Sequence, residues 1–311
     1  MNIAESDAIF TLSLDLELIF AVQEKNEEET DKFRKRILSN IRKRIQELLI
    51  LLEEYQVKAT WAVCGHLFLD RCTGGHGIGE NEWLKRDPAS SIDADPLWYG
   101  RDIVKGIIHN RIDHEIASHG FSHIPFSHIR EEMAFKEVRT SLRAARELGI
   151  AVESFIYPRN EVAHLKVLKE CGIKCYRIVP RKRELGLLPT KFLRSIDYFF
   201  GLRHSSPIKP KKDVFGLLQI PASDALYRSA TAMHLARLPP RNNLLWKWKE
   251  GVKETVKKGG IFHVWMHPHD FKTRVTREEL TKFFKLVKDY KMQGKLKNLT
   301  MKEIALQWRN S

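Results

Sequence analysis

The chain has 311 residues, of which 43% are hydrophobic, 10% aromatic and 30% charged. This is the composition of a globular protein, and the length suits one large domain or two small ones. Lys and Arg outnumber Asp and Glu by 53 to 39, a formal net charge of +14, which suits a polyanionic partner or an anionic membrane surface. It suits a soluble basic protein equally well, because the densest clusters, 181–183 and 209–212, are too short to act as a basic arm.

Cysteine usage and the first residues favour the cytoplasm. The four cysteines (Cys64, Cys72, Cys171 and Cys175) have neither the spacing of a four-thiolate zinc site nor the density of a disulfide framework, so we expect reduced thiols. Residues 1–7 carry no basic region followed by an apolar core, so no secretory signal is expected. No apolar run approaches the roughly 20 residues of a membrane span. The sequence thus predicts a cytoplasmic protein, whose basic surface could still contact the inner face of a membrane.

The chain opens with a strand, a helix and a second strand. Residues 8–22 alternate apolar and polar side chains, so Ser13, Asp15 and Glu17 share one face of the first strand. An acidic pair on a buried strand is costly unless it has a task or a cation; the alternative is an edge strand with a solvated acidic face. Residues 24–56 have apolar side chains at helical spacing and predict one long amphipathic helix. Residues 57–65 predict the second strand, which begins a parallel α/β pattern.

Residues 66–100 interrupt this rhythm and predict a long loop insertion. Four glycines fall between 74 and 79, but no Gly-Lys-Ser/Thr follows them, so they do not form a phosphate-binding loop. Long ordered loops in compact domains are often functional. Trp98 and Tyr99 are candidates to stack on the face of a sugar; the alternative is that they clamp the loop to the body of the protein.

The rest of the chain continues the alternation. The remaining predicted helices are at 101–110, 130–148, 161–172, 188–200, 241–258, 276–292 and 302–308. The remaining predicted strands are at 115–118, 152–160, 174–179, 217–223, 261–270 and 297–300. There is no internal repeat and no linker. We therefore predict a single α/β domain spanning 1–311, an irregular (β/α) barrel with about seven parallel strands.

Polar groups follow four of the predicted strands, at the end where barrel enzymes carry their working residues. The first strand ends in Asp15 and Glu17, and a later one in His119 and His123, with Gly120 between the histidines to let the loop curl. The other two strand ends carry Arg159 with Asn160, and His267 with His269; His263 shares a face with His267. A lone histidine is more often a satisfied residue than a ligand, but four coincident strand ends predict a site.

These residue types permit metal-assisted hydrolysis. One carboxylate and two imidazoles can hold a zinc-like ion and leave a position open for water, and the ion lowers the pKa of bound water from 15.7 towards about 7. A second carboxylate can act as general base, and a histidine on the opposite wall can protonate a leaving amine. An arginine beside the base would keep it ionised.

Taken in order, these motifs resemble those of the polysaccharide deacetylases, the NodB-homology or carbohydrate esterase family 4 enzymes, over roughly residues 8–305. The resemblance implies that Asp15 is the general base and that Glu17, in an Asp-x-Glu form of the motif, is the metal carboxylate. It makes His119 and His123 the metal imidazoles. The altered Tyr157-Pro158-Arg159-Asn160 segment supplies the arginine that contacts the base. The closing Trp265-Met266-His267 segment supplies His267 as the acid.

The resemblance implies a hydrolase that uses a divalent metal, most readily zinc, to remove the acetyl group from an N-acetylated amino sugar, a surface-glycan precursor. A nucleotide- or lipid-linked substrate would match the positive charge. Trp98, Tyr99, Asn160 and His263 are the expected substrate-binding residues. The alternatives are an inactive glycan-binding relative and a hydrolase of another small non-peptide amide. A nucleic-acid partner is not expected, because no recognition helix, zinc finger or RNA-binding aromatic motif is present. The sequence carries no signal for an oligomeric state.

Overall fold

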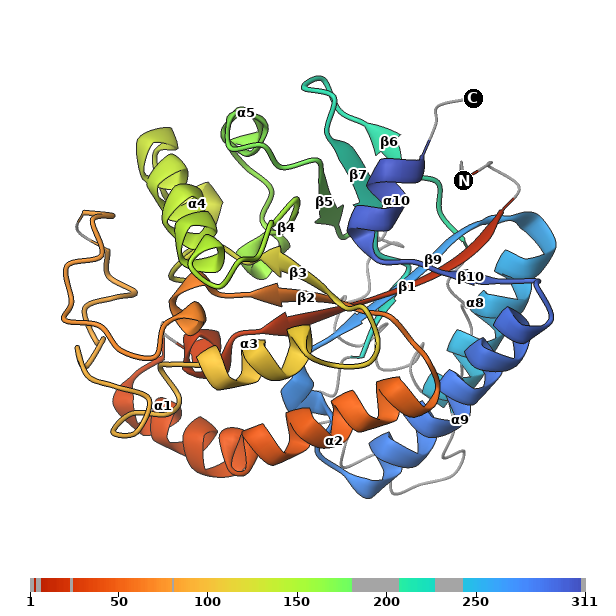
Figure 1. The fold of residues 1–311 in the computed structure, drawn as a ribbon, viewed down its shortest axis with the longest axis horizontal. Coiled ribbons are helices and arrows are strands. Elements are labelled where there is room, and N and C mark those ends of the chain that lie inside the picture. Colours follow the sequence, from red (N-terminus) through yellow and green to blue (C-terminus); the bar gives the residue numbers. More distant parts are fainter. Residues whose placement is uncertain are drawn as a thin grey trace, which may run out of the picture.

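The structure is a computed structural model that describes residue 3 and residues 7–22, 25–79, 81–180, 207–226 and 243–308. Its centre is a ten-stranded sheet with the neighbour order β6-β7-β5-β4-β3-β2-β1-β9-β8, in which β10 also pairs with β1 (Figure 1). The strands are β1 Ala8–Leu16, β2 Thr60–Val63, β3 Glu115–Ser118, β4 Ser154–Ile156, β5 Cys175–Ile178, β6 Lys211–Lys212, β7 Leu218–Pro221, β8 Asp224–Ala225, β9 Gly260–Met266 and β10 Lys297–Asn298. The α-helices are α1 Glu27–Phe33, α2 Ile41–Glu54, α3 Arg101–Ile108, α4 Glu131–Arg146, α5 Leu165–Glu170, α8 Asn243–Lys258, α9 Arg274–Met292 and α10 Met301–Gln307.

The sheet confirms the irregular (β/α) barrel. Every strand pair is parallel among the described residues except β6 with β7. β7 pairs with β5, and β8, only two residues later, pairs with β9. The short segment from β7 to β8 therefore runs from one side of the sheet to the other, which requires the sheet to curl. β6 and β8 were not predicted, because a strand of two residues leaves no periodic signal.

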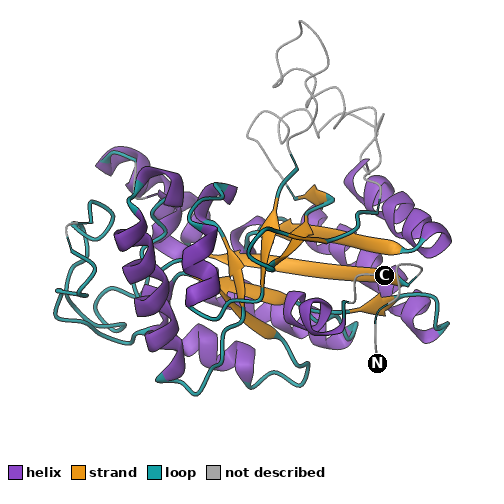
Figure 2. Ribbon diagram, turned by 90° about the horizontal axis from the view of Figure 1, so that it is seen from above, coloured by secondary structure: helices purple, strands orange, loops and turns teal. Residues whose placement is uncertain are grey.

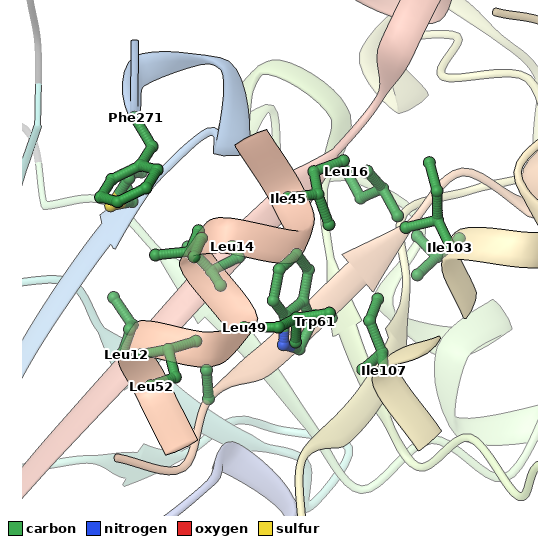
Figure 3. Close-up of a cluster of buried hydrophobic side chains, with 14 of the residues drawn as sticks. Leu12, Leu14, Leu16, Ile45, Leu49, Leu52, Trp61, Ile103, Ile107 and Phe271 are labelled. Carbon is green, nitrogen blue, oxygen red and sulfur yellow. The ribbon is translucent and has the colours of Figure 1, made fainter. Parts of the chain in front are cut away.

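The outer face of the sheet is covered by helices, which surround the central strands in Figure 2. β1 sends alternate side chains outward into the largest hydrophobic cluster, where α2, α3, α8 and α9 pack. Figure 3 shows part of this contact, between the leucines of β1, the apolar stripe of α2, and Trp61 of β2: Leu12, Leu14 and Leu16 face Ile45, Leu49 and Leu52. The apolar side chains of the strand recur every second residue and those of the helix about every 3.6 residues, and these two apolar faces pack against each other, as their sequences predict.

The inner face of the sheet is apolar near the amino ends of the strands and polar near their carboxyl ends. Near the amino ends of the strands, aliphatic side chains such as Ile9 and Ile261 belong to a second cluster, which α10 joins through Met301 and Ile304. Towards the carboxyl ends the inward positions of β1 become polar, and Asp15 is the last of them within the strand. The acidic pair of the first strand therefore lies on a central strand, and the solvated edge strand is excluded.

Two predicted elements differ in the structure. The single helix over 24–56 is interrupted: α1 runs into a widened turn at Arg34–Leu38, and α2 begins after Asn40, whose φ of 57° lies in the left-handed region. A non-glycine residue in that region costs about 1–2 kcal/mol, a local event that apolar spacing does not report. The helix predicted at 188–200 lies outside the described residues. Among the helices that are described, none is long and apolar enough to cross a membrane.

Candidate active site

Three imidazoles converge on one carboxylate at the carboxyl ends of the strands. Glu17 follows β1, and its Oε1 lies 3.2 Å from Nε2 of His119 and 3.0 Å from Nε2 of His123. His267, which follows β9, places its Nε2 3.5 Å from the same oxygen. The donor atoms of Glu17, His119 and His123 all lie within 4.8 Å of one another, as do those of Asp15, Glu17 and His267. The predicted carboxylate and imidazole pair are thus brought together from residues about a hundred positions apart.

The loop that carries the two histidines is shaped by positive φ angles and held by a buried glutamate. Gly120 (φ 73°) and His123 (φ 68°) are both left-handed, a strain that at a non-glycine residue is typical of functional sites. Glu137 of α4 is fully buried below the loop. Its carboxylate accepts from the backbone N–H groups of Phe121 and Ser122 at 2.7 and 2.9 Å, and from the Ser122 hydroxyl at 2.6 Å. Sequence reasoning missed Glu137, which looks like any other charged helix position.

The two ring nitrogens that face Glu17 have the chemistry that a metal requires. Nδ1 of His119 lies 2.6 Å from the carbonyl oxygen of Ile156 and donates to it, which leaves the lone pair on Nε2, as in metal-ligating histidines braced by a second group. His123 is buried, and its Nε2 faces Glu17 at 3.0 Å, yet neither of its ring nitrogens makes a hydrogen bond of good geometry. A buried imidazole without well-directed hydrogen bonds is costly. A divalent ion between His123 and Glu17 would remove that cost, so these residues fit a metal site.

Asp15 is held by Arg177 of β5. Two guanidinium nitrogens donate to the two carboxylate oxygens at 2.7 and 2.6 Å. Burial works to raise the pKa of Asp15, but the attraction and hydrogen bonds of Arg177 outweigh it, so the pKa lies below its usual value. Asp15 is therefore an ionised carboxylate beside Glu17.

The arginine that pairs with Asp15 is Arg177, whereas the arginine predicted for this role was Arg159. Arg159 is exposed, has a φ of 56° and lies over the Trp83 ring at 5.9 Å. Asn160 is linked to Asp15 through Arg177. Its Oδ1 accepts hydrogen bonds from Nε and Nη2 of Arg177 at 3.2 and 2.9 Å. The strand motif could have pointed to Arg177, since a charged residue inside a short apolar strand needs a buried partner.

His267 is oriented by Asp270. Oδ2 of Asp270 lies 3.4 Å from Nδ1 of His267 and accepts from its backbone N–H at 3.0 Å. Nδ1 therefore faces Asp270 and Nε2 faces Glu17. Burial works to lower the pKa of His267, but the two carboxylates raise it well above its usual value. A protonated imidazole whose Nε2 faces the site can give a proton to a leaving group there.

Three of the predicted substrate-binding residues are buried inside the protein. Trp98 is 5% exposed and Tyr99 is fully buried; Trp98 packs edge-on against Phe20 at 5.2 Å, and the Tyr99 hydroxyl accepts from the Ser90 N–H at 2.9 Å. They clamp the loop to the body, the alternative reading of this pair. His263 is fully buried, with Nε2 2.9 Å from the Ser13 hydroxyl, and burial together with the Arg177 cation lowers its pKa to about 3.

The aromatic ring that does lie at the site is Trp83, which sequence reasoning missed. It is half-buried and its ring centroid lies 5.7 Å from that of His123. It comes from the predicted insertion, where Asn81 also reaches the histidine loop by donating to the Ser122 hydroxyl at 2.7 Å. The insertion is therefore one wall of the site, supplied by a different aromatic residue from those expected.

Residues 39–176 match the sequence model of the family described as polysaccharide deacetylase. This part of the chain is similar in sequence to the polysaccharide deacetylases. The matched range includes His119 and His123 but leaves Asp15, Glu17 and His267 outside it. Asp15, Glu17 and His267 are placed together by the distances between their side chains and not by the sequence match. No curated protein matches the chain by sequence.

Solved structures share the fold with low sequence identity. A protein from Mycobacterium smegmatis described as a polysaccharide deacetylase superposes with a TM-score of 0.62 at 16% identity, covering 98% of this chain and 92% of its own. Another so described, from Pseudomonas aeruginosa PAO1, gives 0.57 at 13% identity, covering 97% and 91%. A 4-alpha-glucanotransferase from Thermococcus litoralis gives 0.53 at 15% identity, but this chain spans only 40% of it. The chain therefore shares its fold with proteins described as polysaccharide deacetylases, and residues 39–176 also match the sequence model of that family.

Proposed function

We propose that this protein hydrolyses the acetamide group of an N-acetylated amino sugar and releases acetate, with a divalent metal held by Glu17, His119 and His123. The observation that carries the proposal is the convergence of two imidazole nitrogens on one Glu17 oxygen, at 3.2 and 3.0 Å. Two imidazoles and a carboxylate, with a position left for water, are the donor set of catalytic zinc. Zinc is therefore the metal we propose. When bound, such an ion supplies a Lewis acid that polarises the acetyl carbonyl and makes water more acidic.

The residues around the proposed metal divide the proton transfers between them. Asp15 is ionised and aimed by Arg177, so it is the group that accepts the proton of the attacking water. His267, which follows β9, faces the same Glu17 carboxylate, with Asp270 holding its Nδ1 side. It is the group that gives a proton to the departing amine. Acid and base are thus separate residues on β1 and β9, next to one another in the sheet.

The wall of the site favours a sugar. The half-buried Trp83 ring, with Arg159 beside it, is the surface on which we propose that a pyranose ring stacks, since aromatic rings offer a flat apolar face with a polar margin. The net charge of +14 supports a substrate carrying phosphate, such as a nucleotide- or lipid-linked precursor of a surface glycan. The four free cysteines are in keeping with a reducing compartment, and we propose the cytoplasm, with contact at the inner membrane face for a lipid-linked substrate.

The proposal is tested by acetate release from a panel of N-acetylated sugars: free, nucleotide-linked and lipid-linked. The purified protein should release acetate from at least one of them. Asp15→Asn should retain the metal and lose release, because the amide cannot take the proton of water. Binding of a glycan without release by the wild-type protein would instead identify an inactive binding relative. Release only from small amides that carry no sugar would reject the carbohydrate substrate.

A further inference from the structure

A second group of metal-ligand side chains lies in the insertion between β2 and α3, outside the proposed active site. It consists of His66, Cys72, His76 and Asp87, whose ligand atoms all lie within 4.8 Å of one another. Oδ2 of Asp87 is 3.2 Å from Nε2 of His66, 2.7 Å from Nε2 of His76 and 3.1 Å from Sγ of Cys72. Two nitrogens, one sulfur and one oxygen therefore surround a single point.

The loop is wound so that these four side chains meet. A pair of backbone hydrogen bonds, Cys72 N to Ser90 O at 3.1 Å and Ile92 N to Asp70 O at 2.7 Å, ties its two ends together. Between them, His76 lies among glycines with positive φ: Gly74, Gly75, Gly77 and Gly79, at 76°, 64°, 75° and 93°. Residues with a Cβ rarely adopt these angles, so the chain uses glycine on both sides of His76 to turn it inward. The histidine is 9% exposed at its side chain despite its place at the tip of a loop.

The surrounding groups favour the metal-binding form of two of the ligands, His66 and Cys72. Nδ1 of His66 donates to the carbonyl oxygen of Trp98 at 2.9 Å, which leaves the lone pair on the Nε2 that faces the cluster. The Tyr99 hydroxyl accepts from Ser90 N–H, so its own proton is available to Sγ of Cys72, 3.2 Å away. A hydrogen bond to sulfur stabilises the thiolate form that binds metal. The two buried aromatic residues of this loop thus support the cluster.

We propose that His66, Cys72, His76 and Asp87 form a structural zinc site. Zinc takes four nitrogen, sulfur or oxygen ligands in a tetrahedron, and structural sites leave no position open. With bonds of about 2.0–2.3 Å, tetrahedral ligands lie roughly 3.3–3.8 Å apart, so Oδ2 of Asp87 needs to move away from its three partners by only a few tenths of an ångström. A thiolate with two imidazoles also disfavours magnesium and calcium, which prefer oxygen ligands.

This zinc would hold the insertion against the histidine loop of the active site. The rings of His66 and His76 lie 5.7 and 5.1 Å from that of Phe121, which falls between His119 and His123. The backbone N–H of His66 also donates to the Phe121 carbonyl at 3.0 Å. The same insertion carries Trp83. The metal would therefore fix the glycine-rich part of the insertion, residues 74–79, next to the histidine loop, and it would do so whether or not the barrel is a deacetylase.

Cobalt spectroscopy separates this site from the one in the barrel. The group Glu17, His119 and His123 contains no sulfur, so only the second site can give the near-ultraviolet charge-transfer band of a thiolate bound to Co²⁺. The metal-free protein, prepared under reducing conditions and loaded with Co²⁺, should show this band. Cys72→Ser should abolish it, while His119→Ala should retain it. Cys171→Ser, at a half-buried thiol outside every ligand cluster of the described residues, is the matched control and should retain it too.

Zinc content gives the second readout. The purified wild-type protein and Cys171→Ser should hold two zinc ions per chain, and Cys72→Ser and His76→Ala one. Zinc retained at the wild-type level by Cys72→Ser, or a wild-type Co²⁺ spectrum with no thiolate band, would overturn the proposal and leave Asp87 as the centre of a hydrogen-bonded cluster. A single zinc that is lost in Cys72→Ser and kept in His119→Ala would support this site and count against the metal centre of the barrel.

Discussion

Arg177 and Asp15 form a two-point ion pair inside the barrel, with both guanidinium–carboxylate distances at or below 2.7 Å. Arg177 is fully buried and its other contacts are also satisfied: the Ser13 hydroxyl accepts from Nη1 at 3.0 Å, and the guanidinium carbon lies 4.3 Å from the centre of the Trp265 ring. A planar guanidinium so fixed sets the plane of the carboxylate as well as its charge. The direction in which Asp15 presents its oxygens is therefore decided by β5.

Replacing Arg177 should separate the effect of its hydrogen-bond geometry on Asp15 from the effect of its positive charge. Arg177→Lys keeps the positive charge but cannot make the two parallel hydrogen bonds, whose loss is worth about 1.5–3 kcal/mol. We expect acetate release to fall about tenfold to a hundredfold, with zinc content unchanged. Arg159→Lys is the matched control at an exposed arginine and should retain most of the activity. The opposite ranking of the two variants would restore Arg159 as the partner of the base.

Glu137→Ala should destabilise the loop that carries His119 and His123. The substitution leaves the buried N–H groups of Phe121 and Ser122 without an acceptor, at about 1–3 kcal/mol each. We expect the free energy of unfolding, measured with urea, to fall by about 3–5 kcal/mol and the affinity of the barrel site for zinc to fall with it. Glu147→Ala, at the exposed end of the same helix, should change stability by less than about 0.5 kcal/mol. Equal effects of the two variants would contradict a positioning role for Glu137.

His114 should make the protein less stable in acid. Burial lowers its pKa from 6.5 to about 4, and its Nδ1 accepts from the Ala59 N–H at 3.2 Å, so the folded state requires the neutral ring. Between pH 6.5 and 4 the unfolded chain therefore binds more protons than the folded protein, and stability falls as the pH is lowered. The shift corresponds to about 3 kcal/mol, fully expressed below pH 4.

His114→Asn places an uncharged acceptor near the position of Nδ1 and removes this titration. Urea unfolding at pH 7 and pH 4 should show a smaller loss of stability in the variant than in the wild-type protein. Parallel losses would mean that His114 is protonated in the folded state and that its burial does not couple to pH.

Trp83→Ala tests the proposed sugar platform. Because the ring flanks His123 without contacting Asp15 or His267 among the contacts found, its removal should raise KM several-fold with kcat little changed, as expected when binding is lost equally in ground and transition states. Trp98→Phe should instead lower the melting temperature and leave KM unchanged, since Trp98 is buried against Phe20. A KM effect confined to Trp98→Phe would reverse the assignment of the two rings.

The sequence predicts the barrel and half of the site because both follow from periodicity. Parallel strands place their carboxyl ends at one edge, so the residues that follow β1, β3 and β9 converge without any knowledge of side-chain contacts. Glu17, His119, His123 and His267 are found together for this reason.

The rest of the site depends on long-range contacts that no local pattern records. Arg159 and Arg177 are both charged residues at or near the end of a predicted strand, so the sequence pattern does not distinguish them. Only the register of β5 decides which of them reaches Asp15. Trp83 and Trp98 lie in the same insertion, and the path of that loop decides which ring is exposed. Glu137 and the cluster at Asp87 join residues whose partners are 11 to 56 positions away, so spacing alone does not mark them.

The most direct test of the central claim is acetate release by chelator-treated protein to which zinc is returned, compared between the wild-type chain and His119→Ala. Among the three proposed ligands, the imidazole of His119 has its orientation fixed by a hydrogen bond from Nδ1 to the Ile156 carbonyl at 2.6 Å. We predict that zinc restores release to the wild-type protein and not to the variant, while both keep the thiolate–cobalt band of the second site. Equal release by the two proteins, with or without zinc, would contradict a metal-dependent deacetylase built on Glu17, His119 and His123.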